Sequence, residues 1–281
     1  MKRFHAPDGA TITFDDEGSG RPLVLLHGLM AHRGFFRLQR ALQADFRLVS
    51  VDLRGHGQSV RPGERPSVEQ LADDVTALVE DLDLEGAMGI GWSLGASVLW
   101  HVLTGPAGSR FAGSVIIDMT PKVRNGEDWQ LGLSSELCET RRAGMAGEFE
   151  TFAANAGHAM FAQPLDPGSS ELAAWAGEEF ARNDQASISA LWDSLVEQDL
   201  RPLLGRIRQP SLIVHGAQSQ LYGADTAEYL AQALPDARCV RFDHAGHAPH
   251  LEQPELFNTL IRQFAASLPR VPSTQASKSS H

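Results

Sequence analysis

One serine stands between two glycines in a pattern that could support nucleophilic catalysis. Residues 91–95 read Gly-Trp-Ser-Leu-Gly, after a short apolar run at 87–90 and before a helix-like run of Ala, Val, Leu and Trp. The spacing predicts a strand, a sharp turn with Ser93 at its apex, and a helix. Glycine on both sides lets strand and helix approach closely around a strained serine backbone. Ser93 Oγ would then lie at a helix N-terminus, where backbone N–H groups favour a developing negative charge.

A serine hydroxyl is inert at neutral pH unless a base removes its proton, and histidine is the usual base. The chain contains 11 histidines, and His244, His247 and His250 follow the last predicted strand closely. A Gly-x-Ser-x-Gly run alone also occurs in a plain tight turn. The chemical interpretation therefore depends on whether the fold brings one of these histidines to Ser93.

The elements that would position these residues alternate between strands and helices. Continuous apolar runs predict strands buried on both faces of a parallel sheet at 22–26, 46–51, 87–90, 113–117 and 210–214. A hairpin is predicted over 1–20 and a last strand over 238–242. Helical spacing occurs at 35–44, after Ser67 with its capping-box partner Gln70, at 225–233 and at 254–267. This alternation indicates an α/β fold built from βαβ units.

Residues 122–205 differ in character from the rest of the chain. They are rich in Ala, Glu, Trp and Phe and contain no run typical of a buried strand. We interpret this segment as a helical insertion that divides a core made of residues 1–121 and 206–268. The tail, 269–281, is predicted to be disordered. The aromatic residues of the insertion are expected mostly in its own core, with one or two lining a pocket: Trp129, Phe149, Phe152, Phe161, Trp175, Phe180 and Trp192.

Composition excludes several classes of partner. A net charge of -11 argues against nucleic acid and against anionic membranes, both of which select basic clusters. No run approaches the ~18 apolar residues of a membrane span. The first residues lack an apolar secretory core, so a cytoplasmic protein is expected. The two cysteines, Cys138 and Cys239, lack metal-ligand spacing and are expected to be buried free thiols. Oligomeric state has no signal in the sequence.

Several motifs occur together in one order along the chain: His27-Gly28, Asp52-x-Arg54-Gly55-x-Gly57-x-Ser59, Gly91-x-Ser93-x-Gly95 and Gly246-His247. On these motifs the chain resembles the α/β-hydrolase superfamily over residues 1–268, and within it the small bacterial carboxylesterases, including the pimeloyl-carrier-protein methyl esterase group. The resemblance implies a mostly parallel eight-stranded sheet flanked by helices, with a helical cap (122–205) after strand 6. It also implies chemistry at the C-terminal ends of the strands.

The resemblance implies a role for individual residues. Ser93 is the expected nucleophile and His247 the expected base, because His247 follows the last strand in a Gly-His loop. His244 and His250 remain competitors in that loop. Backbone N–H groups of Leu94 and Leu29 are the expected oxyanion hole, with Met30 as the near alternative to Leu29.

The acid departs from the commonest pattern of the family. The usual position, a few residues after the seventh strand, reads Gly216-Ala217-Gln218-Ser219, so a hydroxyl stands there. Asp225 is nearby but is expected to be a helix N-cap. Asp118, at the end of the sixth strand, is the expected triad acid, since either strand end can orient the same imidazole. Ser219 would be an auxiliary hydrogen-bond partner.

Other patterns indicate structural roles or apolar contacts. Met30 and Trp92 would form an apolar wall of the substrate pocket. The loop from Asp52 to Gly57 is interpreted as structural, with Asp52 and Arg54 fixing turns. The sequence lacks a complete dinucleotide fingerprint and lacks the histidine spacing of a metal site. Neither a cofactor nor a metal is therefore expected.

The expected function is a serine-dependent carboxylic ester hydrolase that works through an acyl-enzyme, on a small ester or an acyl-carrier ester. The same serine chemistry leaves several alternatives open: perhydrolase or cofactor-free haloperoxidase, lactonase, thioesterase, acyltransferase and carbon–carbon bond hydrolase. A non-catalytic binding protein of the same fold is a remote alternative, because such proteins usually lack the serine or the histidine. The sequence does not specify the natural substrate.

Overall fold

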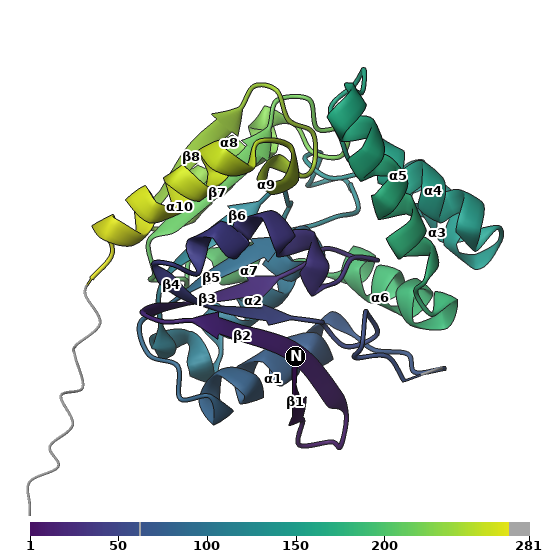
Figure 1. Cartoon of the computed structure of the whole chain (residues 1–281). Coiled ribbons are helices and arrows are strands. Elements are labelled where there is room, and N and C mark those ends of the chain that lie inside the picture. The colour runs from purple at the N-terminus through teal and green to yellow at the C-terminus, as the bar shows by residue number, and fades with distance from the viewer. Residues whose placement is uncertain (62, 270–281) are drawn as a thin grey trace, which may run out of the picture.

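The computed structural model describes residues 1–61 and 63–269 and contains an eight-stranded sheet in the order β1-β2-β4-β3-β5-β6-β7-β8 (Figure 1). The predicted tail beyond residue 269 lies outside the described residues. β1 and β2 pair antiparallel, as do β2 and β4, and the other neighbouring strands are parallel. The strands are β1 (Lys2–His5), β2 (Thr11–Gly18), β3 (Arg21–Leu26), β4 (Phe46–Val51), β5 (Ala87–Trp92), β6 (Phe111–Ile117), β7 (Ser211–Gly216) and β8 (Ala237–Phe242).

Helices cover both faces of this sheet. In Figure 1, α1 lies below it and α10 lies above, and α2 packs against α1. The core helices are α1 (Val68–Asp81), α2 (Leu94–Thr104), α7 (Arg201–Leu204), α8 (Ala224–Ala233), α9 (Pro249–Glu252) and α10 (Pro254–Ser267). Two 3₁₀ segments complete the core, at Arg33–Leu42 and Pro106–Arg110. Strands β3, β5, β6 and β7 consist almost wholly of buried residues because helices pack on both of their sides.

Five helices lie between β6 and β7 in the chain, and the first four of them gather at one side of the molecule (Figure 1). They are α3 (Ser135–Ala146), α4 (Phe149–Ala159), α5 (Pro167–Ala181) and α6 (Gln185–Glu197). We call them the inserted helices. Close packing of α4 on α5 depends on small residues, since a Cβ on Gly157 would lie 2.4 Å from the backbone nitrogen of Gly177.

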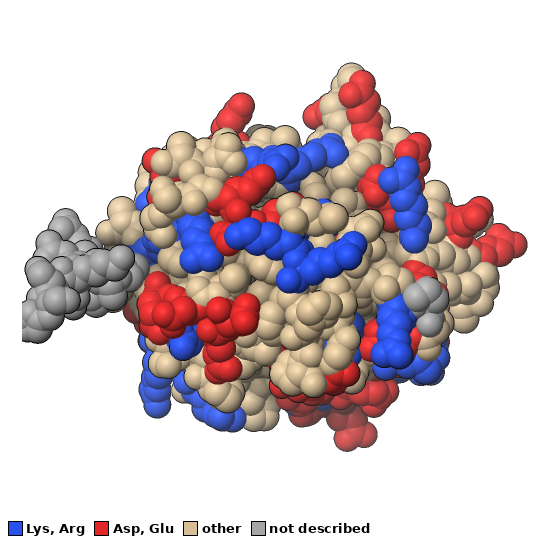
Figure 2. All heavy atoms as spheres, turned by 60° about the horizontal axis from the view of Figure 1, so that its bottom comes forward, with Lys and Arg blue, Asp and Glu red and all other residues tan. Residues whose placement is uncertain are grey.

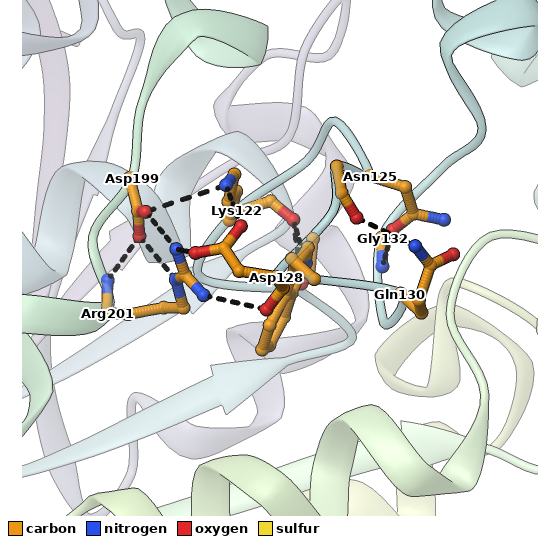
Figure 3. A network of polar contacts seen from close by, with 10 residues as sticks. Lys122, Asn125, Asp128, Gln130, Gly132, Asp199 and Arg201 are labelled. Atoms are coloured by element: carbon orange, nitrogen blue, oxygen red, sulfur yellow. Dashed lines mark hydrogen bonds and ion pairs between the residues drawn. The ribbon is translucent and has the colours of Figure 1, made fainter.

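A network of charged side chains joins the two ends of the insertion (Figure 3). Lys122 and Asp199 form a β-bridge. Asp128 accepts hydrogen bonds from Lys122 at 3.0 Å and from Arg201 at 2.7 Å. The Arg201 guanidinium also lies 5.3 Å from the ring centroid of Trp129. Chain segments about 75 residues apart are thus held together where they leave the sheet.

The structure confirms the α/β-hydrolase fold class and the mostly parallel sheet of eight strands. Three local expectations were wrong. The 35–44 helix is a 3₁₀ segment, Arg33–Leu42, with non-helical backbone angles at Phe36. Cys239 is exposed, because β8 is an edge strand, whereas Cys138 is buried. Asp225 lies in the first turn of α8, and its N-cap is Gly223.

Charges of both signs are interspersed over the face shown in Figure 2, where groups of acidic side chains lie beside basic ones. This pattern, with a net charge of -11, does not give that face the basic character that phosphate backbones select. Within residues 1–61 and 63–269, no helix combines the length and apolar character needed to cross a bilayer.

Candidate active site

Ser93 occupies a strained turn between β5 and α2. Its backbone has φ 52° and ψ -120°, a conformation that is costly for a residue with a Cβ. The flanking glycines make the turn feasible: a Cβ on Gly95 would lie 2.1 Å from the Leu26 carbonyl oxygen, and one on Gly91 would lie 2.5 Å from the Gly95 carbonyl oxygen. The Ser93 N–H donates to Ile117 O at 3.0 Å, which fixes the turn beside the end of β6.

Asp118 follows β6 directly and receives two short hydrogen bonds on one oxygen. His247 Nδ1 donates to Asp118 Oδ2 at 2.6 Å, and Ser219 Oγ donates to the same oxygen at 2.6 Å. Asp118 Oδ1 is buried and has no partner among the described residues. The Asp118 backbone has φ 45° and its N–H donates to Val214 O, so it is held against β7. The structure therefore brings the predicted acid, base and auxiliary serine into direct contact.

The loop that carries His247 is fixed from two sides. Glu252 accepts the N–H of Gly246 at 2.8 Å and the N–H of Ala162 at 2.7 Å. The His247 N–H donates to Met160 O at 2.7 Å. Burial of Glu252 raises the pKa of its carboxyl group to about 7, against the opposing effect of these N–H donors. Glu252 thereby links the histidine loop to the residues that follow α4.

Among the described residues, neither of the other two candidate histidines forms a hydrogen bond with Asp118. His244 is exposed, and His250 is buried with its ring centroid 5.0 Å from that of Trp92. Burial lowers the pKa of His250 to about 3, so it is neutral at pH 7. His27 is also neutral for the same reason. It accepts the Leu53 N–H on Nε2 and contacts its neighbouring carbonyl through Nδ1, which joins the ends of β3 and β4.

The loop after β3 passes directly over Ser93. A Cβ on Gly28 would lie 3.3 Å from Ser93 Cβ, so any larger residue would crowd the serine. Leu29 follows in the same loop, and Leu94 is the first residue of α2. Neither the Leu29 N–H nor the Leu94 N–H donates to an acceptor in the described part of the chain. Met30 is buried with φ 68°, and its carbonyl accepts from Asn183 of the insertion.

The Asp52–Gly57 loop has structural contacts. Asp52 accepts the N–H groups of Arg33 and Gln58, each at 2.8 Å. Arg54 forms a buried bidentate pair with Asp74. These contacts fix the turn after β4, as the sequence predicts.

A cavity of about 70 Å³ lies between the strand ends and the inserted helices. Ser93 and His247 line it, together with Leu29, Met30 and Trp92. The remaining lining is mostly apolar and comes largely from the insertion: Gly28, Leu133, Arg141, Ala156, Ala159, Met160, Phe180, Trp192, Leu195, Leu221 and Tyr222. Trp92 also forms a hydrogen bond with the histidine loop: its Nε1 donates to His247 O at 2.8 Å.

Sequence reasoning missed three polar residues of this region. Arg141 and Tyr222 line the cavity, and Glu252 supports the histidine loop. Arg141 lies on α3, far in sequence from the motifs, and only helix packing brings it to the cavity. Glu252 could have been recognised from the sequence, since it follows the Gly246-His247 motif closely. Among the described residues, no three His, Cys, Asp or Glu side chains are grouped to hold a metal ion.

Comparisons with known proteins agree with the fold. A family model described as "alpha/beta hydrolase fold" matches residues 21–254. The pimeloyl-[acyl-carrier protein] methyl ester esterase of Nitrosomonas europaea is 32% identical over 256 residues, covering 88% of this chain and 97% of that protein. A non-heme chloroperoxidase of Streptomyces lividans is 28% identical over 269 residues, covering 92% and 98%. A solved esterase structure from Exiguobacterium antarcticum matches with a TM-score of 0.88 at 24% identity, covering 94% and 99%, which is a likeness of fold.

Proposed function

Because the chain belongs to the α/β-hydrolase fold family, we propose that it hydrolyses carboxylic esters through an acyl-enzyme on Ser93. His247 is the proposed base and Asp118 the residue that orients it. The family and the esterase-like character of its relatives support hydrolysis in general. The observation that carries the serine mechanism is the 2.6 Å contact between Asp118 and His247, beside a cavity that Ser93 also lines.

The mechanism follows from these positions. His247 takes the Ser93 proton on Nε2 as Oγ attacks the ester carbonyl carbon, and Asp118 stabilises the imidazolium through Nδ1. The N–H groups of Leu94 and Leu29 hold the oxyanion of the tetrahedral intermediate. His247 then protonates the leaving alcohol oxygen. Water repeats the sequence on the acyl-enzyme, which releases the carboxylic acid and restores Ser93.

The inserted helices serve as a cap in this proposal. Together with Leu133 and Met160 of the same segment, they supply most of the apolar cavity wall, so they select the group attached to the ester. The curated relative from Nitrosomonas europaea is named for a methyl ester carried on acyl-carrier protein. We extend to this chain only the ester class, either a free small ester or one on a carrier.

Covalent labelling tests this function. A fluorophosphonate probe should modify Ser93, and the S93A variant should lose both the label and the hydrolysis of p-nitrophenyl butyrate, by about 10⁴-fold or more. The S97A variant is the control, because Ser97 is on the same helix and lies outside the cavity lining. Labelling of another residue, or turnover by S93A near that of the unaltered protein, would exclude the mechanism.

A second activity is favoured by one comparison, the chloroperoxidase relative. On the same machinery hydrogen peroxide, in place of water, would attack the acyl-enzyme and release a peracid. Peracid formation from acetate and peroxide at a rate above ester hydrolysis would favour this assignment over the esterase.

A further inference from the structure

The cavity contains a cation that the proposed ester chemistry does not use. Arg141 reaches it from α3, on the wall formed by the inserted helices, while Ser93 and His247 lie on the wall formed by the sheet. The guanidinium carbon lies 5.3 Å from the ring centroid of Trp192 and 5.5 Å from that of Phe152. Two aromatic faces therefore hold the guanidinium group in place.

No carboxylate of the described chain compensates this charge. The Nε atom of Arg141 is buried and has no hydrogen-bond partner within residues 1–61 and 63–269. Two ionisable groups, Tyr222 and Cys138, lie near enough to act on the charge of Arg141 if they were themselves ionised. Burial raises the pKa of both, so both are neutral at pH 7. Arginine itself stays protonated in proteins.

The neighbouring arginine shows the ordinary arrangement. Arg142 has a side chain that is 49% exposed and pairs with Asp193 at 2.7 Å and with Glu139 at 3.6 Å. Arg141 is the more buried of the two and has no such acid in the described chain. An unpaired charge in an apolar cavity is costly unless something with the opposite charge binds there. Cation–π contacts offset only part of that cost.

We propose that Arg141 forms an anion subsite that binds a carboxylate of the ester substrate while Ser93 attacks the ester carbonyl. Guanidinium presents two parallel N–H donors that match a carboxylate. Tyr222 lines the same cavity and carries a hydroxyl that can donate a hydrogen bond to such a group. This inference rests on the proposed ester hydrolysis and narrows its substrate class to small esters that carry a carboxylate.

The size of the cavity limits the length of that substrate. At about 70 Å³ it is far smaller than the ~300 Å³ or more of common drug-sized sites. Short half-esters of dicarboxylic acids, with the carboxylate in the acyl part, fit this chemistry. Esters of short hydroxy acids, with the carboxylate in the alcohol part, fit it equally. The shared feature is an anionic end a few carbons from the ester.

Matched pairs of substrates test the subsite. Monomethyl glutarate is compared with methyl valerate for the acyl side, and 3-acetoxypropanoate with propyl acetate for the alcohol side. In one of these pairs the carboxylate ester should have a kcat/KM at least about tenfold higher than its neutral partner, and the pair that shows it identifies the side.

Three variants separate binding from folding. R141M should lower kcat/KM for the preferred carboxylate ester about 100-fold, mainly through KM, and leave the neutral ester within about twofold. R141K should lose less, because it keeps the charge without the paired donors. R142M is the control and should leave both rates unchanged. Removal of an unpaired buried charge should also leave the melting temperature of R141M no lower than that of R142M.

Failure of this inference is distinct from failure of the proposed function. Equal kcat/KM within both pairs, or an R141M variant that loses both members equally, would overturn the subsite while ester hydrolysis stands. Hydrolysis of none of the four esters would count against the function itself. Binding is then measured without turnover: glutarate should bind S93A by calorimetry and bind S93A/R141M at least about tenfold more weakly, and equal affinities would overturn the subsite.

Discussion

Asp118 accepts two short hydrogen bonds on a single carboxylate oxygen, one from the proposed base and one from the auxiliary serine. His247 and Ser219 donate to Oδ2, while the buried Oδ1 has no partner in the described chain. Ser219 therefore fixes the rotation of the carboxylate, and the carboxylate fixes the imidazole. In the proposed mechanism, the hydroxyl at the usual acid position would therefore support an acid supplied by the neighbouring strand. Asp118 and Ser219 differ in role, so substitution of each should lower activity to a different extent.

Substitution of Asp118 should cost far more activity than substitution of Ser219. D118N should lower kcat about 10⁴-fold, because an amide no longer holds the imidazole with its proton on Nδ1. S219A removes one hydrogen bond to the carboxylate, worth about 1 kcal/mol, and should lower kcat by about tenfold or less. Steady-state assays on one p-nitrophenyl ester measure both effects.

Asp225 supplies the control for the acid assignment. It is exposed in the first turn of α8, so D225N should leave kcat unchanged. A D118N variant that keeps most of its turnover, with D225N or S219A inactive, would show that the acid is misplaced. Circular dichroism of each variant separates lost chemistry from lost folding.

At the scale of elements, the site depends on how closely α2 approaches β3. A Cβ at Gly95 would lie 2.1 Å from Leu26 O, and backbone cannot yield as a flexible side chain does. The strand ends then come into register: Trp92 pairs with Ile117, so Ser93 and Asp118 follow neighbouring strands. Gly216 allows the histidine loop to contact β7 in the same way, since its Cβ would lie 1.9 Å from Gly246 O.

The G95A variant should be strongly destabilised. The added methyl group must push α2 away from β3, and overpacking against backbone costs about 3 kcal/mol. G205A is the matched control: Gly205 has φ -65°, and nothing lies within 4 Å of the position that an added Cβ would occupy. Alanine there should stabilise the protein by about 0.4–1 kcal/mol. Urea unfolding of both variants checks this, and equal unfolding free energies would contradict the role of Gly95.

The sequence predicts elements well where one local pattern determines them. Buried parallel strands appear as continuous apolar runs, and the residues that follow them meet at one edge of the sheet. Ser93, Asp118 and His247 could therefore be predicted together. No comparable signal points to Arg141, because its place depends on how four inserted helices pack. Exposure of Cys239 likewise depends on strand order, which places β8 at an edge.

At the scale of the whole molecule, three buried histidines couple stability to pH. Burial lowers the pKa of His27, His56 and His250 to about 3 each, below the ordinary value of 6.5. Between those limits the unfolded chain binds protons that the folded chain does not. The free energy of unfolding should therefore fall as pH falls from 6.5, by up to about 1.4 kcal/mol per pH unit for each histidine.

Glu252 acts in the opposite sense over part of this range. Its pKa of about 7 in the folded protein exceeds the ordinary 4.5, so the folded chain holds the extra proton between those values. Its contribution to stability falls as pH rises from 4.5 to 7, which partly offsets the histidines. Burial also lowers the pKa of His215, so four histidines oppose one carboxyl group, and the net expectation is loss of stability in acid.

Single substitutions should change that slope by about one proton each. H250L replaces a ring that has no hydrogen-bond partner for either nitrogen in the described chain and that packs on Phe36, Trp92 and Phe257. Its unfolding free energy should decline less steeply between pH 6 and 4 than that of the unaltered protein. E252Q should decline more steeply, because it removes the opposing group. Urea titrations at several pH values measure both slopes. If H250L keeps the original slope, His250 takes up its proton in the folded protein as readily as in the unfolded chain, which would contradict its lowered pKa.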